Sequence, residues 1–91
     1  MSVRVRVPSA LRAKMGSAGE VDVEAHDVAQ VLCLLRERYP DLARCLYNEQ
    51  GQLRPVVQIY VNDEHVRFRQ GLETPLHDGD RVYIVPLVMG G

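Results

Sequence analysis

The chain has 91 residues, of which 46% are hydrophobic and 25% are charged, and its formal net charge is -1. This length allows one domain with a single core, and the composition is that of a globular protein and excludes wholesale disorder. A net charge so near zero gives no basic field that would attract nucleic acid or an anionic membrane. We therefore expect a small folded domain that binds neither.

The N-terminal half begins with two segments that alternate as half-buried strands do. Residues 3–7 alternate valine with arginine as far as Pro8, and residues 21–25 alternate apolar residues with Asp22 and Glu24. The turn-rich stretch "KMGSAGE" lies between them. The pattern predicts two strands that pair as a hairpin.

The period then changes to that of a helix. Asp27 and Gln30 have the spacing of a capping box, and the apolar residues that follow recur at helical spacing, namely Val28, Val31, Leu32 and Leu35. We expect an amphipathic helix that runs to about Tyr39. Because proline disfavours helical geometry in the residue before it, "PDLARCLY" from Pro40 onward is predicted as a turn plus a short helical piece.

Three further strands are predicted in the C-terminal half. Residues 57–61 alternate as a third strand, which turns at "NDE" into a short fourth strand around Val66 and Phe68. The segment "GLETPLHDGD" is predicted to be a turn with Leu72 and Leu76 as apolar anchors. The last strand is expected from Val82 to about residue 87.

The order β-β-α-β-β-β predicts an α+β fold in which one main helix covers one face of a mixed sheet. In such a sheet the first and last strands commonly lie side by side. If Val82, Ile84 and Pro86 face the helix, the intervening side chains face away from it. That open face is predicted to carry Tyr83, Val85, Leu87, Tyr60, Gln58, Arg4 and Arg6.

This open face is a candidate docking surface. Scattered apolar residues on a solvated sheet face are common. However, a contiguous apolar and aromatic patch edged by arginine is typical of protein interfaces. We therefore predict that a protein partner binds there.

No group of residues predicts a catalytic or metal site. Cys33 and Cys45 lack CxxC and zinc spacing and are expected to be packed into the fold, while His26, His65 and His77 lie beside turns and are expected to be solvent-exposed. The acidic turns "NDE" and "HDGD" lack the spacing of a calcium loop. There is no phosphate-binding glycine loop or nucleophile elbow, so we expect no enzyme, no metal and no bound cofactor.

The N-terminus lacks the continuous apolar run of a signal peptide, and no stretch could span a bilayer. We therefore expect a soluble protein in the reducing cytoplasm.

The sequence ends in "VYIVPLVMGG". Glycines without Cβ atoms can thread a narrow channel in another enzyme, where a side chain would collide. A carboxylate is unreactive at neutral pH, so it must become an acyl-adenylate before a sulfur nucleophile can attack it. We predict a domain over residues 1–87 and a flexible tail over residues 88–91, with Met89, Gly90 and Gly91 in the tail. The protein would then be a substrate and carrier.

The stretch "QIYVNDEHVRFRQGLETPLHDGDRVYIVPLVMGG" resembles the MoaD/ThiS ubiquitin-like sulfur-carrier family. It is similar in particular to the branch that delivers sulfur for cysteine biosynthesis in actinobacteria, and a looser resemblance extends over the whole chain. The resemblance implies a ubiquitin-like β-grasp fold. It also implies an E1-like activating enzyme that uses ATP to adenylate Gly91, sulfur transfer to give a C-terminal thiocarboxylate, and delivery to a biosynthetic enzyme. The family's functional positions carry over to Gly90 and Gly91.

Two other classes of function stay open beside the sulfur carrier. A ubiquitin-like modifier conjugated to protein lysines would use the same tail and the same adenylate, and the chain's single lysine, Lys14, argues only against self-linked chains. A non-covalent β-grasp binding module would not need the glycines. The final sulfur acceptor is open as well: cysteine, molybdopterin, thiazole or a secondary metabolite.

Overall fold

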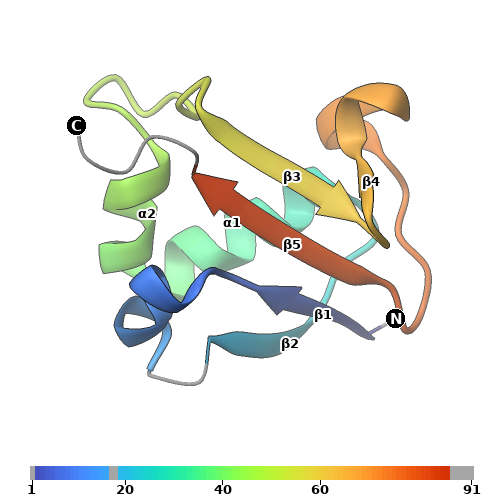
Figure 1. Ribbon diagram of the computed structural model, residues 1–91, viewed down its shortest axis with the longest axis horizontal. Coiled ribbons are helices and arrows are strands. Elements are labelled where there is room, and N and C mark those ends of the chain that lie inside the picture. Colours follow the sequence, from blue (N-terminus) through green and yellow to red (C-terminus); the bar gives the residue numbers. More distant parts are fainter. Residues whose placement is uncertain (1, 17–18, 87–91) are drawn as a thin grey trace.

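The computed structural model describes residues 2–16 and 19–86. In chain order the elements are β1 (Ser2–Arg6), the 3-10 helix η1 (Ser9–Met15), β2 (Glu20–Glu24), α1 (Val28–Arg38), α2 (Pro40–Leu46), β3 (Val57–Val61), β4 (Glu64–His65), the 3-10 helices η2 (Val66–Phe68) and η3 (Gly71–Glu73), and β5 (Arg81–Pro86) (Figure 1). No helix in this part of the chain is long and apolar enough to cross a membrane.

The described strands form one mixed sheet in the order β2-β1-β5-β3-β4. The last strand lies in the middle, where β5 pairs in parallel with β1 and antiparallel with β3 (Figure 1). The hairpin of β1 and β2 is antiparallel, as predicted. The prediction that the first and last strands lie side by side is confirmed. Consequently Pro86, the last described residue, ends the central strand of the sheet.

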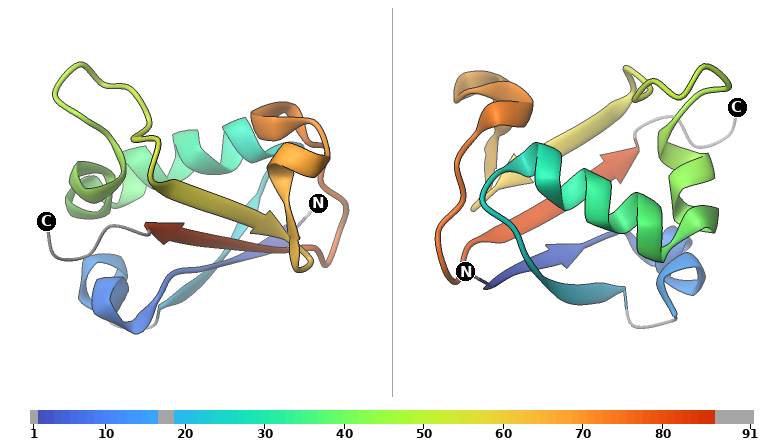
Figure 2. Two further views of the ribbon diagram at one scale, coloured as in Figure 1. Left: turned by 45° about the horizontal axis from the view of Figure 1, so that its top comes forward. Right: turned by 180° about the vertical axis from the view of Figure 1, so that it is seen from behind.

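Helix α1 covers one face of the sheet, and the opposite face carries no helix among the described residues (Figures 1 and 2). The predicted cap is present: the Asp27 carboxylate accepts a hydrogen bond from the Gln30 backbone N–H at 2.8 Å. The Gln30 side chain reaches back to the His26 N–H at 2.6 Å, one residue before the usual capping-box partner. The helix ends at Arg38, directly before Tyr39 and Pro40, as expected.

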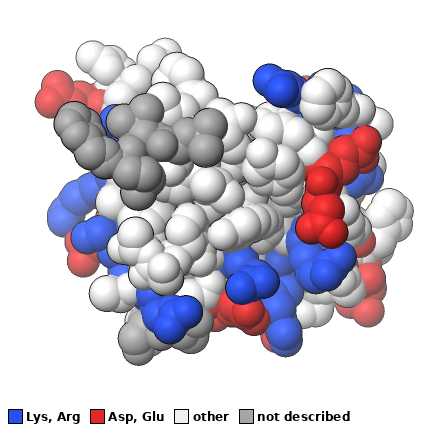
Figure 3. Space-filling model, viewed as in Figure 1, with Lys and Arg blue, Asp and Glu red and all other residues white. Residues whose placement is uncertain are grey.

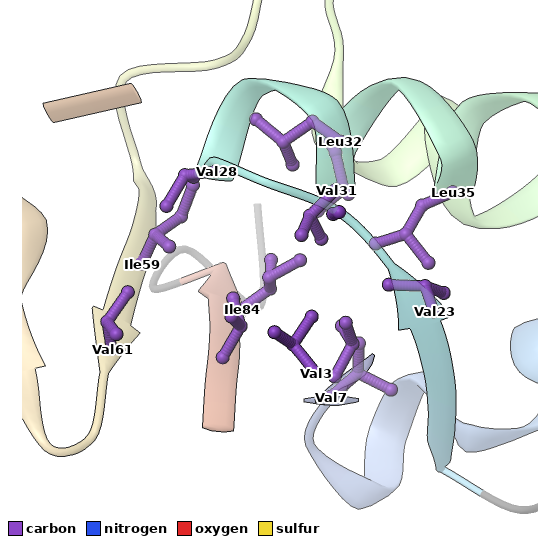
Figure 4. Close-up of a cluster of buried hydrophobic side chains, with 14 of the residues drawn as sticks. Val3, Val7, Val23, Val28, Val31, Leu32, Leu35, Ile59, Val61 and Ile84 are labelled. Atoms are coloured by element: carbon purple, nitrogen blue, oxygen red, sulfur yellow. The ribbon is translucent and has the colours of Figure 1, made fainter. Parts of the chain in front are cut away.

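The core lies between α1 and the sheet (Figure 4). The helix contributes the four apolar residues that were predicted, Val28, Val31, Leu32 and Leu35, all at most 4% exposed. From the sheet come the inward residues of each long strand, among them Val3, Val5, Val23, Ile59, Val61, Val82 and Ile84. Because side chains alternate along a strand, this burial fixes which residues face outward.

Two segments differ from the sequence prediction. Residues 9–15 form η1, a helical segment that was not predicted, and its residues Leu11 and Met15 are buried. Val66 and Phe68 belong to η2 and not to a strand, since β4 ends at His65. The cause is local: the His65 ring nitrogen Nδ1 accepts the Arg67 backbone N–H at 3.0 Å, which bends the chain out of the extended conformation.

The turn between β3 and β4 is a tight two-residue connection. Asn62 and Asp63 both have positive φ, at 50° and 74°, which is the geometry of a type I′ hairpin turn. Asn and Asp tolerate this conformation better than other residues with side chains. The predicted turn at "NDE" is therefore confirmed, with Glu64 already in β4.

Candidate docking face and the end of the last strand

The outward side chains of four strands lie in register across the open face of the sheet. Arg6 on β1 is paired with Tyr83 on β5, Tyr83 with Tyr60 on β3, and Tyr60 with His65 on β4. Toward the end of β5, Val85 is paired with Gln58. We call this set of outward residues the open face. Figure 3 shows it as a broad uncharged area over β3 and β5, with charged side chains gathered along its edges.

Aromatic rings form a row along this face and beyond it. The Tyr60 and His65 rings meet edge to face with centroids 5.1 Å apart, and His65 meets Phe68 in the same way at 6.4 Å. At the other end the Arg6 guanidinium lies 5.8 Å from the centre of the Tyr83 ring. Edge-to-face ring pairs and cation–π contacts each favour a defined side-chain position.

The arginines on β1 are paired with acids of the neighbouring strand. Arg4 lies 3.1 Å from Asp22 and 3.7 Å from Glu20, and Arg6 lies 3.2 Å from Glu20. The hydrogen bond to Asp22 and the negative charges of Asp22 and Glu20 raise the pKa of Arg4 above its ordinary value. All four side chains are about half exposed, so each pair contributes little to stability. The edge of the face toward β2 is therefore charged but balanced.

The structure brings together the described members of the predicted docking surface. Tyr83 is 41% exposed, Val85 and Tyr60 are partly exposed, and Arg4 and Arg6 are exposed on the same side. Val82, Ile84 and Pro86 are buried toward α1, as predicted. The remaining predicted site residues, Leu87, Met89, Gly90 and Gly91, lie outside the described residues.

A hollow on the open face, toward the start of β5, is small for a bound small molecule. It measures about 70 Å³ and is lined by Arg6, Tyr60, Tyr83 and Arg81 among others. Sites for small ligands are typically several times larger, at roughly 300 to 1,000 Å³. Within residues 2–16 and 19–86, no three histidine, cysteine, aspartate or glutamate side chains lie together as metal ligands would.

One cysteine and one histidine differ from expectation, whereas Cys45 is packed against the core as expected. Cys33 was expected to be packed but is exposed, because it lies on the side of α1 turned away from the sheet. Cys45 is half-buried, and its Sγ lies 3.7 Å from the Asp41 carbonyl oxygen. His65 is partly buried and hydrogen-bonded rather than a free polar residue, with Nε2 2.5 Å from Gln58 Oε1.

Sequence reasoning missed two exposed apolar side chains beside this face. Phe68 was expected in a strand, yet it is 68% exposed, and Leu72 was expected as a buried anchor, yet it is 41% exposed. The other predicted anchor, Leu76, is 3% exposed. The segment "VRFRQGLETPL" contains more apolar residues than the core takes up, and this excess was the signal from which the exposed side chains could have been predicted.

The comparisons with known proteins agree with this geometry. A mixed sheet of this strand order, which packs against one main helix and has the last strand of the chain in its centre, defines a ubiquitin-like β-grasp domain. The Amycolatopsis orientalis BexX/CysO complex contains a chain that superposes with a TM-score of 0.81 at 35% identity, covering 98% of this chain and 99% of that one. The small archaeal modifier protein 1 of Methanosarcina acetivorans superposes with a TM-score of 0.83 at 31% identity, covering 99% of this chain and 96% of that one.

Sequence comparison extends the similarity over the full length. The Mycobacterium tuberculosis protein named sulfur carrier protein CysO is 39% identical over 93 residues, which covers all of both chains. The model of the ThiS family matches residues 5–91. The chain belongs to the ThiS family. The expectations of a β-grasp fold and of a protein that is not itself an enzyme are confirmed by these relatives.

Proposed function

We propose that this protein is a sulfur carrier whose C-terminal Gly91 is activated by a separate ATP-dependent, E1-like enzyme in the cytoplasm. The observation that carries the proposal is the central position of β5, which places Pro86, the last described residue, on the strand that carries Tyr83 and Val85 of the open face. A partner that binds the open face would thereby hold the following residues close to its own active site. The full-length similarity to a named sulfur carrier supports the same role.

The proposed chemistry takes place in two steps on the terminal carboxyl group. First, the Gly91 carboxylate attacks the α-phosphate of ATP, pyrophosphate leaves, and an acyl-adenylate forms. Then a sulfur nucleophile at the oxidation level of sulfide attacks the carbonyl carbon and AMP leaves, which gives a thiocarboxylate without a redox change. The carrier itself binds no cofactor in this scheme, because the partner enzyme binds the ATP.

The sulfur is then delivered to a biosynthetic enzyme. The similarity to a protein named CysO favours cysteine biosynthesis as the destination. The same terminal group could also serve molybdopterin, thiazole or a secondary metabolite, because each acceptor needs only the thiocarboxylate sulfur.

Intact-protein mass spectrometry tests the proposal. The purified protein is incubated with the adenylating enzyme of the same genome, ATP and a sulfide donor. We expect a mass increase equal to the difference between sulfur and oxygen, confined to the C-terminal peptide. The proposal fails if the mass is unchanged, or if the sulfur is found on a peptide that contains Cys33 or Cys45.

A ubiquitin-like modifier is the second candidate, because the chain is 31% identical to a structure named as a small archaeal modifier protein. In that case an amine of a lysine side chain, and not a sulfur nucleophile, attacks the adenylated carboxyl group or a thioester made from it. Immunoblots of denatured cell extract distinguish the two functions. A ladder of conjugates favours the modifier, whereas a single band whose mass shows a thiocarboxylate favours the carrier.

A further inference from the structure

Phe68 and Leu72 are a pair of exposed apolar side chains on the two short 3-10 helices that follow β4. Phe68 is 68% exposed on η2 and Leu72 is 41% exposed on η3, and both elements follow β4 at the edge of the sheet (Figure 1). Neither side chain is needed to fill the core. Large apolar groups that stay in water are typical of interaction sites when they lie next to other exposed rings.

The Phe68 ring meets the His65 ring edge to face, and the backbone turn that carries it is closed by hydrogen bonds. His65 Nδ1 accepts the Arg67 backbone N–H at 3.0 Å, and the Arg69 N–H donates to the Val66 carbonyl oxygen at 2.9 Å, which closes η2. Because Nδ1 is an acceptor, the proton lies on Nε2 and is donated to the Gln58 side chain at 2.5 Å. A ring fixed before binding loses less entropy when a partner covers it.

Arg67 adds an unpaired positive charge to this pair. Its guanidinium lies 5.0 Å from the centre of the Phe68 ring. The other arginines around the open face each have an acid of this chain: Arg4, Arg6, Arg69 and Arg81 pair with residues of β2, β4 or the β3–β4 turn. Arg67 has no ion pair within residues 2–16 and 19–86. Its charge is therefore available to a carboxylate on another molecule.

We propose that Phe68, Leu72 and Arg67 form a selectivity anchor for the activating enzyme, and that they enter an apolar pocket bordered by a carboxylate on that enzyme. The proposal rests on the function proposed above and names the part of the carrier that its first partner recognises. The row from Tyr83 through Tyr60 and His65 makes the anchor continuous with the open face.

One partner can reach both the anchor and the chain that follows Pro86. A six-residue strand such as β5 is about 20 Å long. A standard interface covers about 800 Å² on each partner, which is a patch about 30 Å across. Contacts far from the reacting carboxyl group can supply binding energy that selects this carrier before adenylation. The activating enzyme acts first, so selection at that step excludes other tails that end in glycine.

Steady-state adenylation by the activating enzyme of the same genome tests the anchor, with pyrophosphate release as the readout and a binding titration without ATP in parallel. We expect Phe68→Ser to raise the KM for the carrier and the dissociation constant at least about fivefold, and Phe68→Leu to restore most of the loss. A saturating concentration of the Phe68→Ser carrier should restore the rate of adenylation. Arg67→Gln should weaken binding, whereas the matched control Arg38→Gln, on the exposed end of α1, should not.

The outcomes separate this inference from the proposed function. If the wild-type protein neither binds nor is adenylated, the proposed function fails and the anchor fails with it. If the wild-type protein is adenylated and Phe68→Ser shows an unchanged KM and dissociation constant, the anchor alone is wrong. The anchor is also wrong if Phe68→Ser only impairs transfer to the acceptor enzyme, or only dissociates a homodimer seen by analytical ultracentrifugation.

Discussion

The Asn62 side chain joins the β3–β4 turn to Asp80 at the start of β5. Its amide nitrogen donates to the Asp80 carboxylate at 2.8 Å, and its carbonyl oxygen accepts the Arg81 backbone N–H at 3.0 Å. The second Asp80 oxygen accepts the His77 N–H at 2.8 Å. Burial raises the pKa of Asp80, but these hydrogen bonds and the nearby charges of His77 and Arg69 outweigh it, so the pKa lies below its ordinary value.

We predict that Asp80→Asn destabilises the domain by about 1 to 2 kcal/mol at pH 7, because one acceptor oxygen becomes a donor that faces the His77 N–H. The folded pKa lies below the unfolded value of about 3.9. The charged carboxylate therefore stabilises the fold above about pH 4, and this contribution is lost as the pH falls through the folded pKa. Urea unfolding at pH 7 and pH 3 should show a difference from wild type that shrinks at the lower pH.

Asp63→Asn is the matched control for Asp80→Asn. The Asp63 side chain is 93% exposed and lies 3.8 Å from Arg81, so its loss should change stability little. An equal loss of stability in both variants, or a loss in Asp80→Asn that does not depend on pH, would contradict the stabilising role assigned to the Asp80 carboxylate.

The outward phase of β5 leads to a second prediction. Val85 is only partly buried on the open face, so Val85→Asp should leave the domain folded while lowering its affinity for the activating enzyme by roughly 30-fold or more. Val82 is 1% exposed, so Val82→Asp should unfold the domain by placing an unpaired charge in the core. Thermal denaturation and a binding titration measure both effects. A folded Val85→Asp variant that binds like wild type would rule out the open face as the docking surface.

Deleting Gly91 or replacing it with Phe should abolish adenylation. The reason is steric, because only glycine can pass a channel that excludes side chains. The fold should survive, since the buried core cluster lies between Val3 and Ile84. Pyrophosphate release with the activating enzyme and far-UV circular dichroism test the two halves of this prediction. Normal adenylation of the Phe variant would refute it.

The double variant Cys33→Ser and Cys45→Ser should still form the thiocarboxylate. The proposed sulfur is carried on the terminal carboxyl group, and Cys33 is exposed, so its replacement should cost little stability. Intact mass after the sulfur-transfer reaction is the measurement. A folded double variant that acquires no sulfur would assign a role to a thiol.

The sequence predicted the regular part of this fold well, because periodic burial leaves a direct trace in the order of residues. The alternation in residues 3–7 and 57–61 and the helical spacing from Val28 to Leu35 each correspond to an observed element. The phase of β5 was also predictable, and with it the side on which Tyr83 lies.

The irregular part could not be predicted in the same way. Residues 66–76 contain enough apolar residues for a strand, but the His65 ring accepts the Arg67 backbone N–H and thereby stabilises η2, and such a bond has no periodic signature. For the same reason Phe68 was placed in a strand and Leu72 was interpreted as an apolar anchor. Cys33 was misplaced because its general tendency to be buried was given more weight than its position on the helix.

The central position of β5 also has a consequence for the order of events during synthesis. The strand made last separates β1 from β3, and these two strands have no pairing with each other. A nascent chain that still lacks residues 81–86 therefore has no strand that pairs with both β1 and β3. The sheet is completed only when the C-terminal strand pairs with the N-terminal one. Such long-range closure is slow compared with local folding. An unfinished chain therefore lacks both the open face and the residues after Pro86, so a partner that needs both would bind only the completed domain.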